Sequence, residues 1–234
     1  MLDTNFNMYS DAKGGDPDRT SPTLRRYHML LWSKTLPNGE FFELHENRNG
    51  SYLWHNSSLG AFSLGSDAIT HSYKNHLTKK WITSQIPQEV NELFNLGSTI
   101  GAYIIFPNKQ VERKNTINQA RGTTKLIDDR FDLTLECIKR FYHNKSNPLE
   151  ETLNRYKGFF QLFSNFKGYI EFFLLQDLVD DKGEIKFYLP FDNFQSIPKF
   201  TNKEEYILYK NKVMYFIECR NRRIAEYIIE SKNN

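Results

Sequence analysis

The residue types best suited to chemistry occur in two separate stretches of the sequence, one basic and one acidic. The basic stretch, residues 23–34, contains Arg25, Arg26, His28 and Lys34. Guanidinium groups bind phosphate through paired hydrogen bonds, and an imidazole beside them can transfer a proton or hold a ribose hydroxyl. The alternative is that the basic side chains are solvated and that the histidine is an ordinary hydrogen-bonded strand residue.

The acidic stretch, residues 127–142, has apolar residues at helical spacing on one face and carboxylates on another. Asp129, Asp132 and Glu136 recur on the polar face, with Arg130 beside them. Clustered carboxylates can bind a hard cation or act as acid and base. They can equally form ion pairs with lysine and arginine residues along the same helix. Because the spacing matches no metal motif, we expect no bound metal ion.

Two weaker polar groups lie between these stretches. Asn118 and Arg121 precede the acidic helix, where Gly122 would let the backbone approach a ligand and the helix N-terminus would attract an anion. Ser66 follows a predicted strand and could contact a nucleotide. Ordinary helix capping by Ser66, Asp67 or nearby threonines explains both groups equally well.

The elements that must position these residues are mostly strands in the first half of the chain and helices in the second. The predicted strands are Tyr27 to Trp32, Glu40 to Leu44, Ser51 to His55, Gly60 to Leu64 and, later, residues 102–106 and 185–189. Asn-Gly turns at residues 38–39 and 49–50 favour hairpins, so the first four strands should form an antiparallel meander. The predicted fold is α+β, with an N-terminal antiparallel β-meander packed on a mainly helical C-terminal half.

Helices are predicted where apolar residues recur at steps of three and four. They cover residues 87–96, 127–142, 149–163, 166–179 and 203–230. Residues 1–22 are polar and are predicted to form an irregular arm. With 234 residues, 39% of them apolar and 15% aromatic, the chain can bury a sizeable core, so we expect a single domain over residues 1–234.

Several protein classes are disfavoured by the sequence. No run approaches eighteen apolar residues, and the N-terminus lacks the basic and apolar regions of a secretory signal, so we expect neither a membrane span nor secretion. Cys137 and Cys219 are expected to be buried free thiols, which indicates a reducing, cytoplasmic location. The net charge of +3 permits a nucleic-acid partner without arguing for one. No P-loop, dinucleotide-binding or nucleophile-elbow motif occurs.

Several long strings of the sequence resemble an uncharacterised bacterial family that carries only a domain-of-unknown-function label. Examples are T-I-G-A-Y-I-I-F-P at residues 99–107 and D-R-F-D-L-T-L-E-C-I-K-R-F-Y at residues 129–142, and the similarity covers about residues 16–195. The resemblance brings no activity with it, but it implies that polar residues within these strings line one pocket. They are Arg25, Arg26, His28, Lys34, Asn118, Arg121, Asp129, Arg130, Asp132, Glu136, Gln176 and Asp177.

The sequence is also similar, more weakly, to ADP-ribosyltransferase toxins, including those of phage-defence systems. Those compact α+β domains use an early His or Arg, a later Ser or Tyr and a catalytic Glu, and His28, Ser66 and Glu136 occur here in that order. The resemblance implies that His28 with Arg25 or Arg26 would hold the ribose and phosphates of NAD, the co-substrate, while Glu136 would stabilise the cationic sugar. The glutamate here lies in a predicted helix, whereas that family places it at a strand edge.

We therefore expect an intracellular enzyme acting on a nucleotide or nucleic acid, most concretely an ADP-ribosyltransferase-like effector that would pair with an antitoxin or another defence-complex protein. The first alternative is a metal-independent ribonuclease, with His28 and Lys34 as proton-transfer and charge-stabilising groups. The second is a non-catalytic ligand-sensing or protein-binding module of a defence complex. The enzymatic hypotheses require Arg26 and His28 to face Asp132 and Glu136 across one cleft.

Overall fold

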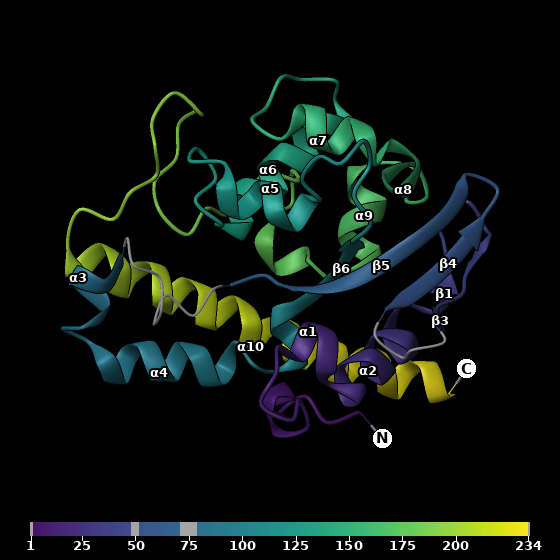
Figure 1. Ribbon diagram of the computed structural model, residues 1–234, viewed down its shortest axis with the longest axis horizontal. Helices are drawn as coiled ribbons and strands as arrows, with labels where there is room; N and C mark the ends of the chain where they lie inside the picture. Colours follow the sequence, from purple (N-terminus) through teal and green to yellow (C-terminus); the bar gives the residue numbers. More distant parts are fainter. Residues whose placement is uncertain (1, 48–51, 71–78, 234) are drawn as a thin grey trace.

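The centre of the molecule is an antiparallel sheet of four strands (Figure 1). The computed structural model describes residues 2–47, 52–70 and 79–233. The strands are β3 (His45–Glu46), β4 (Leu53–Ser57), β5 (Gly60–Ala68) and β6 (Tyr103–Pro107), and they lie in that order. A separate two-stranded ribbon is made of β1 (Lys34–Thr35) and β2 (Phe41–Phe42). Neighbouring strands are antiparallel throughout, as the meander prediction required.

Helices occur in both halves of the described chain and outnumber the strands in the second half. They are α1 (Pro17–Thr20), α2 (Pro22–Trp32), α3 (Lys80–Thr83), α4 (Pro87–Leu96), α5 (Ile117–Thr123), α6 (Phe131–Tyr142), α7 (Glu150–Arg155), α8 (Lys157–Gln161), α9 (Phe166–Phe172) and α10 (Lys203–Asn233), with 3-10 turns at Met8–Ser10 (η1), Ile100–Ala102 (η4) and Gln176–Leu178 (η5). The predicted α+β class is confirmed. Among these described helices, none combines the length and the apolar character that crossing a membrane requires.

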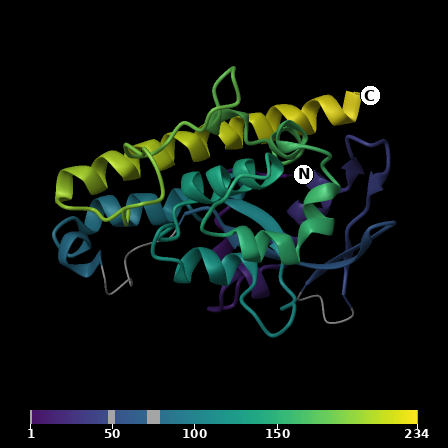
Figure 2. The same cartoon turned by 90° about the horizontal axis from the view of Figure 1, so that it is seen from above.

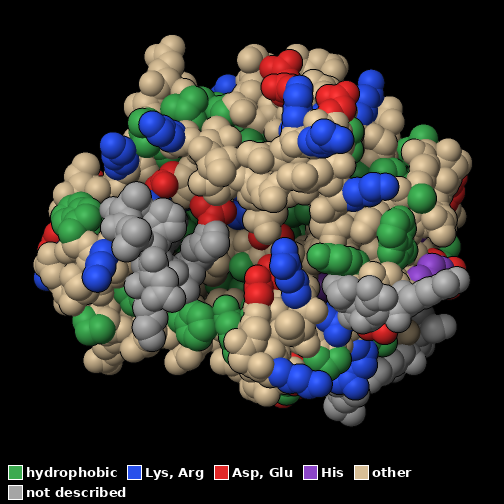
Figure 3. All heavy atoms as spheres, viewed as in Figure 1, with side chains coloured by type: hydrophobic (Ala, Val, Ile, Leu, Met, Phe, Trp, Pro, Cys, Tyr) green, Lys and Arg blue, Asp and Glu red, His purple; other side chains and the backbone are tan. Residues whose placement is uncertain are grey.

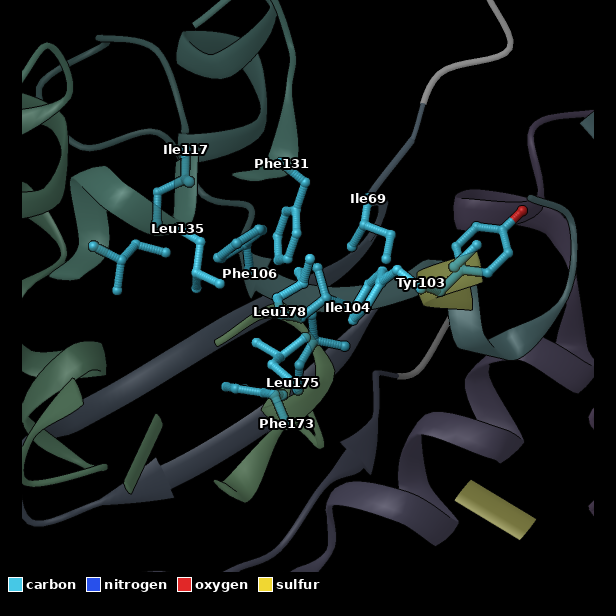
Figure 4. Packing of buried hydrophobic residues seen from close by; sticks show 14 of the residues in the cluster. Ile69, Tyr103, Ile104, Phe106, Ile117, Phe131, Leu135, Phe173, Leu175 and Leu178 are labelled. Carbon is cyan, nitrogen blue, oxygen red and sulfur yellow. The ribbon is translucent and has the colours of Figure 1, made fainter. Parts of the chain in front are cut away.

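Strand β6 lies in the hydrophobic core. Every residue of Tyr103–Pro107 is buried. Phe131 of α6 and Leu178 of η5 pack in the same apolar cluster as Ile104 and Phe106 (Figure 4). An uninterrupted apolar run is typical of a strand that is covered on both faces.

Helix α10 extends along one side of the molecule for most of its length (Figure 2). Arg220 of this helix is fully buried and donates hydrogen bonds to the backbone oxygens of Gly101 at 2.9 Å, Tyr103 at 2.8 Å and Phe173 at 2.9 Å. Asn221 Oδ1 accepts a hydrogen bond from the Gly101 backbone at 2.8 Å. Burial lowers the pKa of the Arg220 guanidinium to about 10, which leaves it charged at neutral pH. These bonds hold α10 against the start of β6 and the end of α9.

One predicted strand is a helix. Residues 27–32, which include His28, belong to α2. The side chain of Ser21 caps this helix by accepting a hydrogen bond from the Leu24 backbone at 3.1 Å, and Pro22 occupies the first helical turn. The buried residues of α2 recur at helical spacing. The strand prediction was wrong because the cap and this spacing outweigh the apparent alternation of polar and apolar residues.

Two predicted helices are shorter than expected. The helix predicted over residues 149–163 is broken at Tyr156 into α7 and α8. The helix predicted over residues 166–179 ends at Phe172. Leu174 follows α9 with a left-handed backbone conformation, φ 53°, which no continuous helix can contain.

Three further predictions changed in detail or were not tested. The strand predicted at residues 185–189 forms only an isolated bridge between Val179 and Ile185. The arm of residues 1–22, predicted to be irregular, contains η1 and α1. The predicted turn at residues 49–50 lies outside the described residues.

Candidate functional site

A polar cleft lies where α1 packs against β5, beside the N-terminal end of α5. Two adjoining cavities, of 530 and 400 Å³, share Asp16, Asp18, Asp67 and Asn118 among their lining residues. We call this region the carboxylate cleft. Acidic and basic side chains gather around the hollowed middle of the face that Figure 3 shows. The cleft therefore lies between the N-terminal arm, which supplies Asp16 and Asp18, and the central sheet, which supplies Asp67.

Asp67 is the carboxylate of the sheet. It lies on β5 opposite Ile104 of β6 and is 5% exposed. Arg121, which is fully buried on α5, donates from Nη1 to Asp67 Oδ2 at 2.5 Å, and its Nε donates to Thr134 Oγ1 at 3.1 Å. Desolvation raises the pKa of Asp67 to about 6 although the guanidinium lowers it. Asp67 is therefore predominantly ionised at neutral pH.

Asp18 is the carboxyl group of α1, and its environment differs from that of Asp67. Its Oδ1 atom is buried and has no hydrogen-bond partner among the described residues. Desolvation and the negative charges of Asp67 and Asp16 raise its pKa to about 8, although a hydrogen bond with Ser66 lowers it. Asp18 therefore carries a proton at neutral pH, next to an ionised neighbour.

A hydrogen-bonded chain leads from the core to Ser66, which lines the 400 Å³ cavity of the cleft with Asp18. Trp32 Nε1 donates to His28 Nδ1 at 2.9 Å, and His28 Nε2 lies 2.7 Å from Ser66 Oγ. Because an indole N–H can only donate, His28 Nδ1 must be unprotonated. Burial and Arg220 lower the pKa of His28 to about 3, so the imidazole is neutral and carries its proton on Nε2. His28 thus donates to Ser66, and Ser66 can direct its own proton to Asp18.

The direction of this chain decides what Ser66 can do. An activated serine needs a neighbouring imidazole nitrogen that accepts its proton. Here the nitrogen that faces Ser66 is protonated, because Trp32 occupies the opposite nitrogen of His28. His28 therefore does not activate Ser66, and the geometry does not support a nucleophilic serine.

The cleft brings together part of the predicted set of site residues. His28 and Ser66 are in contact, Asn118 lines both cavities, and Arg121 holds Asp67. Asp129 lies behind the cleft, with its Oδ1 3.4 Å from Arg121 Nη2.

The other predicted acidic residues are neutralised by nearby partners. Asp132 is fully buried and is paired with Arg130, and its Oδ2 also accepts a hydrogen bond from the Tyr188 backbone at 2.9 Å. Glu136 pairs with Arg140 at 2.7 Å, one helical turn away. The ion pairs that were the alternative to a catalytic role are thus present in the structure.

The expected polar face of this helix is also not formed. Asp129 precedes α6 and has a left-handed backbone, φ 59°, so the helix begins only at Phe131. Asp132 points into the core, whereas Glu136 is partly exposed. The three carboxylates therefore do not share one face, and the prediction that they do was wrong.

The predicted basic group is dispersed. Arg25 donates to the Arg19 backbone oxygen at 3.1 Å and lies 3.5 Å from Glu46. Arg26 is exposed on α2 and lies over the ring of Tyr27.

Lys34 lies among aromatic rings. Its Nζ is 5.1 Å from the ring of Trp32, 4.7 Å from Phe172 and 4.6 Å from Tyr227. Burial and, to a smaller extent, Arg220 lower the pKa of Lys34 to about 7. None of Arg25, Arg26 and Lys34 is among the described residues that line the two cavities of the cleft.

Sequence reasoning missed the three aspartates of the cleft. Asp16 and Asp18 occur in the D-P-D string at residues 16–18, where Asp16 caps α1 and Pro17 starts it. This capping pattern was a detectable signal for an ordered helix in the N-terminal arm. Asp67 was interpreted as a helix cap, but it is a buried strand residue.

Two other large cavities lack a pair of carboxyl groups with raised pKa values among their described residues. One, of 560 Å³, is lined by Lys79, Lys125, Lys199 and Trp81, and in it Lys79 pairs with Asp128 at 2.6 Å. The other, of 680 Å³, lies between residues of α6, α9 and the turn that follows. Convergent polar groups with perturbed pKa values in a cavity mark a site for chemistry, which favours the carboxylate cleft.

In the described ranges, no group of three or more His, Cys, Asp or Glu side chains is arranged to hold a metal ion.

One family model matches nearly the whole chain. The model of a family of unknown function, DUF6994, matches residues 2–224. No curated protein and no solved structure matches the chain. The family match therefore brings no activity with it.

Proposed function

We propose that this chain, which belongs to the DUF6994 family, is an enzyme that cleaves a glycosidic bond by acid–base catalysis in the carboxylate cleft. The observation that supports the proposal is that Asp18 and Asp67 line the same two cavities, where burial raises the pKa of Asp18 to about 8 and the pKa of Asp67 only to about 6. Pairs of carboxyl groups with separated pKa values serve as acid and base in glycoside hydrolysis.

The two aspartates would have complementary roles. Asp18 would donate its proton to the leaving group while the bond from the anomeric carbon to that group breaks. Asp67, held ionised by Arg121, would stabilise the positively charged sugar and accept a proton from the water molecule that attacks the anomeric carbon. The products would be the free sugar and the protonated leaving group; Asp67 would then release the proton it accepted to solvent, and Asp18 would regain its proton from solvent.

The charge of the cleft favours a neutral sugar at the reacting position over a polyanion. Asp16, Asp18 and Asp67 line it, and Arg19 is the one cation among the described lining residues. A phosphodiester backbone placed between the aspartates would meet like charges. The ribonuclease hypothesis has less support, because His28 is neutral, buried and bonded through both ring nitrogens.

The nucleotide-directed hypothesis is retained in this proposal in a modified form. The bond between nicotinamide and ribose in NAD is also glycosidic, so an ADP-ribosyltransferase-like reaction would fit the same cleft. Its catalytic carboxylate would then be Asp18 or Asp67, since Glu136 is paired with Arg140.

The test is a survey of glycosidic substrates with the purified protein. Wild-type protein is incubated with 4-nitrophenyl glycosides, nucleosides, nucleotides and NAD, and the release of sugar and leaving group is followed by chromatography. Asp18→Asn and Asp67→Asn should each lower kcat by about 100-fold or more, the usual contribution of a positioned acid or base. Asp180→Asn, on an exposed turn, is the matched control and should retain full activity.

Two results would overturn the proposal. The first is the absence of any product from folded wild-type protein across the substrate set, which would favour the non-catalytic ligand-sensing or partner-binding module. The second is product formation that Asp18→Asn and Asp67→Asn leave unchanged.

A further inference from the structure

The two cavities beside Asp18 and Asp67 differ in chemical character, and this difference indicates which substrate fits them. We call the 530 Å³ cavity, which is lined by Tyr9, Phe94 and Tyr103, the aromatic cavity. We call the 400 Å³ cavity, which is lined by Arg19, Asn108, Gln110 and Gln119, the amide cavity. Both have volumes suited to small-molecule fragments. The aspartates stand between them, where a bond joining two unlike groups would lie.

The aromatic cavity presents a partly free ring. Tyr9 packs against Phe94 with ring centroids 4.9 Å apart, yet 43% of Tyr9 remains exposed. The Tyr103 hydroxyl points away from the apolar cluster in Figure 4, and Tyr103 also lines this cavity. Gly15 and Gly97 leave the walls without long side chains there. A flat aromatic group can therefore stack on Tyr9.

The amide cavity offers hydrogen-bonding groups and a cation. Asn108 Oδ1 accepts from Ser63 at 2.7 Å, which leaves its amide N–H groups for a ligand. The Asn118 amide forms no hydrogen bond with another described residue, and it lines both cavities. The exposed Arg19 forms no ion pair with the rest of the described chain. Amides and a free guanidinium suit sugar hydroxyls and a phosphate group.

We infer that the substrate is a nucleoside monophosphate, with its base in the aromatic cavity, its ribose between Asp18 and Asp67, and its phosphate at Arg19. This assignment rests on the proposed glycosidic cleavage. It also accounts for the protonated Asp18. A neutral nucleobase leaves as an anion unless it is protonated, so a general acid accelerates its departure. Nicotinamide leaves NAD as a neutral molecule and needs no proton.

The first test probes the aromatic cavity through the leaving group. Tyr9→Leu should lower kcat/KM for purine and pyrimidine nucleotides by about tenfold, the usual effect of losing one base-stacking ring. Hydrolysis of methyl riboside, which has no base, should be unchanged. The matched control is Phe41→Leu, which alters a 58% exposed ring on β2.

The second test probes the amide cavity through the phosphate. Arg19→Gln should raise KM for nucleoside monophosphates by about tenfold and leave KM for the corresponding nucleosides unchanged, because only the phosphate loses its cationic partner. Arg26→Gln, an exposed arginine on α2, is the control and should alter neither value. Thermal melting of each variant verifies that it is folded.

The outcomes separate this inference from the proposed function. Sugar release that shows no preference for nucleobases, or that Tyr9→Leu leaves unchanged, would overturn the substrate assignment while acid–base cleavage at Asp18 and Asp67 stands. If no substrate is cleaved, equilibrium dialysis with adenosine, cytidine and uridine monophosphates still tests the cavities. Binding that Tyr9→Leu and Arg19→Gln weaken would support the assignment without catalysis, and absence of binding would overturn it.

Discussion

Two buried arginines, Arg130 and Arg121, pair with aspartates in different parts of the described structure, and of their partners Asp132 and Asp67 it is Asp67 that lines the carboxylate cleft. Arg130 and Asp132 are two residues apart, and both guanidinium nitrogens Nε and Nη2 bond to the carboxylate, Nε at 3.1 Å. Arg121 and Asp67 are 54 residues apart and join α5 to β5 through one carboxylate oxygen. The first pair is closed by the Tyr188 backbone, whereas the second lies beside Asp18 in the cleft.

The difference shows which buried charges are available for chemistry. A carboxylate that accepts three hydrogen bonds on its roughly four lone-pair sites has little acceptor capacity left for a substrate or a proton. Asp132 is in that state, and its role is to connect α6 with the segment around Tyr188. Asp67 receives fewer bonds and has a carboxyl neighbour, so burial and repulsion perturb the pKa values of both groups. A buried carboxylate that receives few hydrogen bonds and lies next to a cavity is a candidate for chemistry, whereas one that is fully paired is structural.

The largest expected effect is on the pair of Arg130 and Asp132. Arg130→Met should lower the free energy of unfolding by about 3–5 kcal/mol, because it leaves the Asp132 charge buried without its cation. Urea unfolding followed by circular dichroism measures the change. The double variant Arg130→Met with Asp132→Leu should recover most of the loss, since no charge then remains buried. A loss below about 1 kcal/mol in the single variant would contradict the assignment of this pair as structural.

The sequence predicted those elements whose signals are local. The strand expected at residues 102–106 is β6, shifted by one residue, because a continuous apolar run between Gly101 and Pro107 has few other solutions. The helix expected over residues 203–230 is α10, whose buried residues keep helical spacing over many turns.

The site was only partly predictable because it depends on long-range pairing. Strand β5 was expected to end at Leu64, since Gly65 and Ser66 are typical of turns. Pairing with β6, in which Ser66 lies opposite Ile105, overrides that local preference and carries the strand to Ala68. No local pattern indicates that α1 then packs on this strand.

The next prediction concerns Asp18, which lines the cleft beside Asp67, and it is tested through the free energy of unfolding. Asp18→Asn should raise the free energy of unfolding at pH 9 by about 1–2 kcal/mol while it lowers activity, because the amide removes a charge from beside Asp67. Urea titrations at pH 9 of the variant and the wild type measure the difference. The control is Asp181→Asn, an exposed aspartate in a turn that makes no side-chain hydrogen bond with the rest of the described chain, which should have no effect. Destabilisation by Asp18→Asn would show that this carboxyl group is a structural partner like Asp132.

The pH dependence of stability follows from the raised pKa of Asp18, about 8 when folded against an ordinary value near 3.8. Between these values the folded state binds the proton and the unfolded state does not. Stability should therefore fall as pH rises from about 4 to about 8, by at most about 1.4 kcal/mol per pH unit for one proton, and level off above. Asp67 adds to the fall below about pH 6. Subtracting the stability–pH profile of Asp18→Asn from that of the wild type isolates the part due to Asp18. Parallel profiles of the two proteins would contradict the raised pKa of Asp18.

The smallest expected effect concerns Glu136, the residue that the resemblance to ADP-ribosyltransferases made catalytic. Its pair with Arg140 is a partly exposed contact one helical turn apart, of the kind that contributes about 0.3–0.5 kcal/mol. Glu136→Gln should therefore lower the free energy of unfolding by no more than this and leave any glycosidic cleavage unchanged, as measured by urea unfolding and by the substrate survey. Loss of activity in Glu136→Gln with Asp18→Asn still active would move the catalytic centre from the carboxylate cleft to α6, and would reverse the distinction between the two regions.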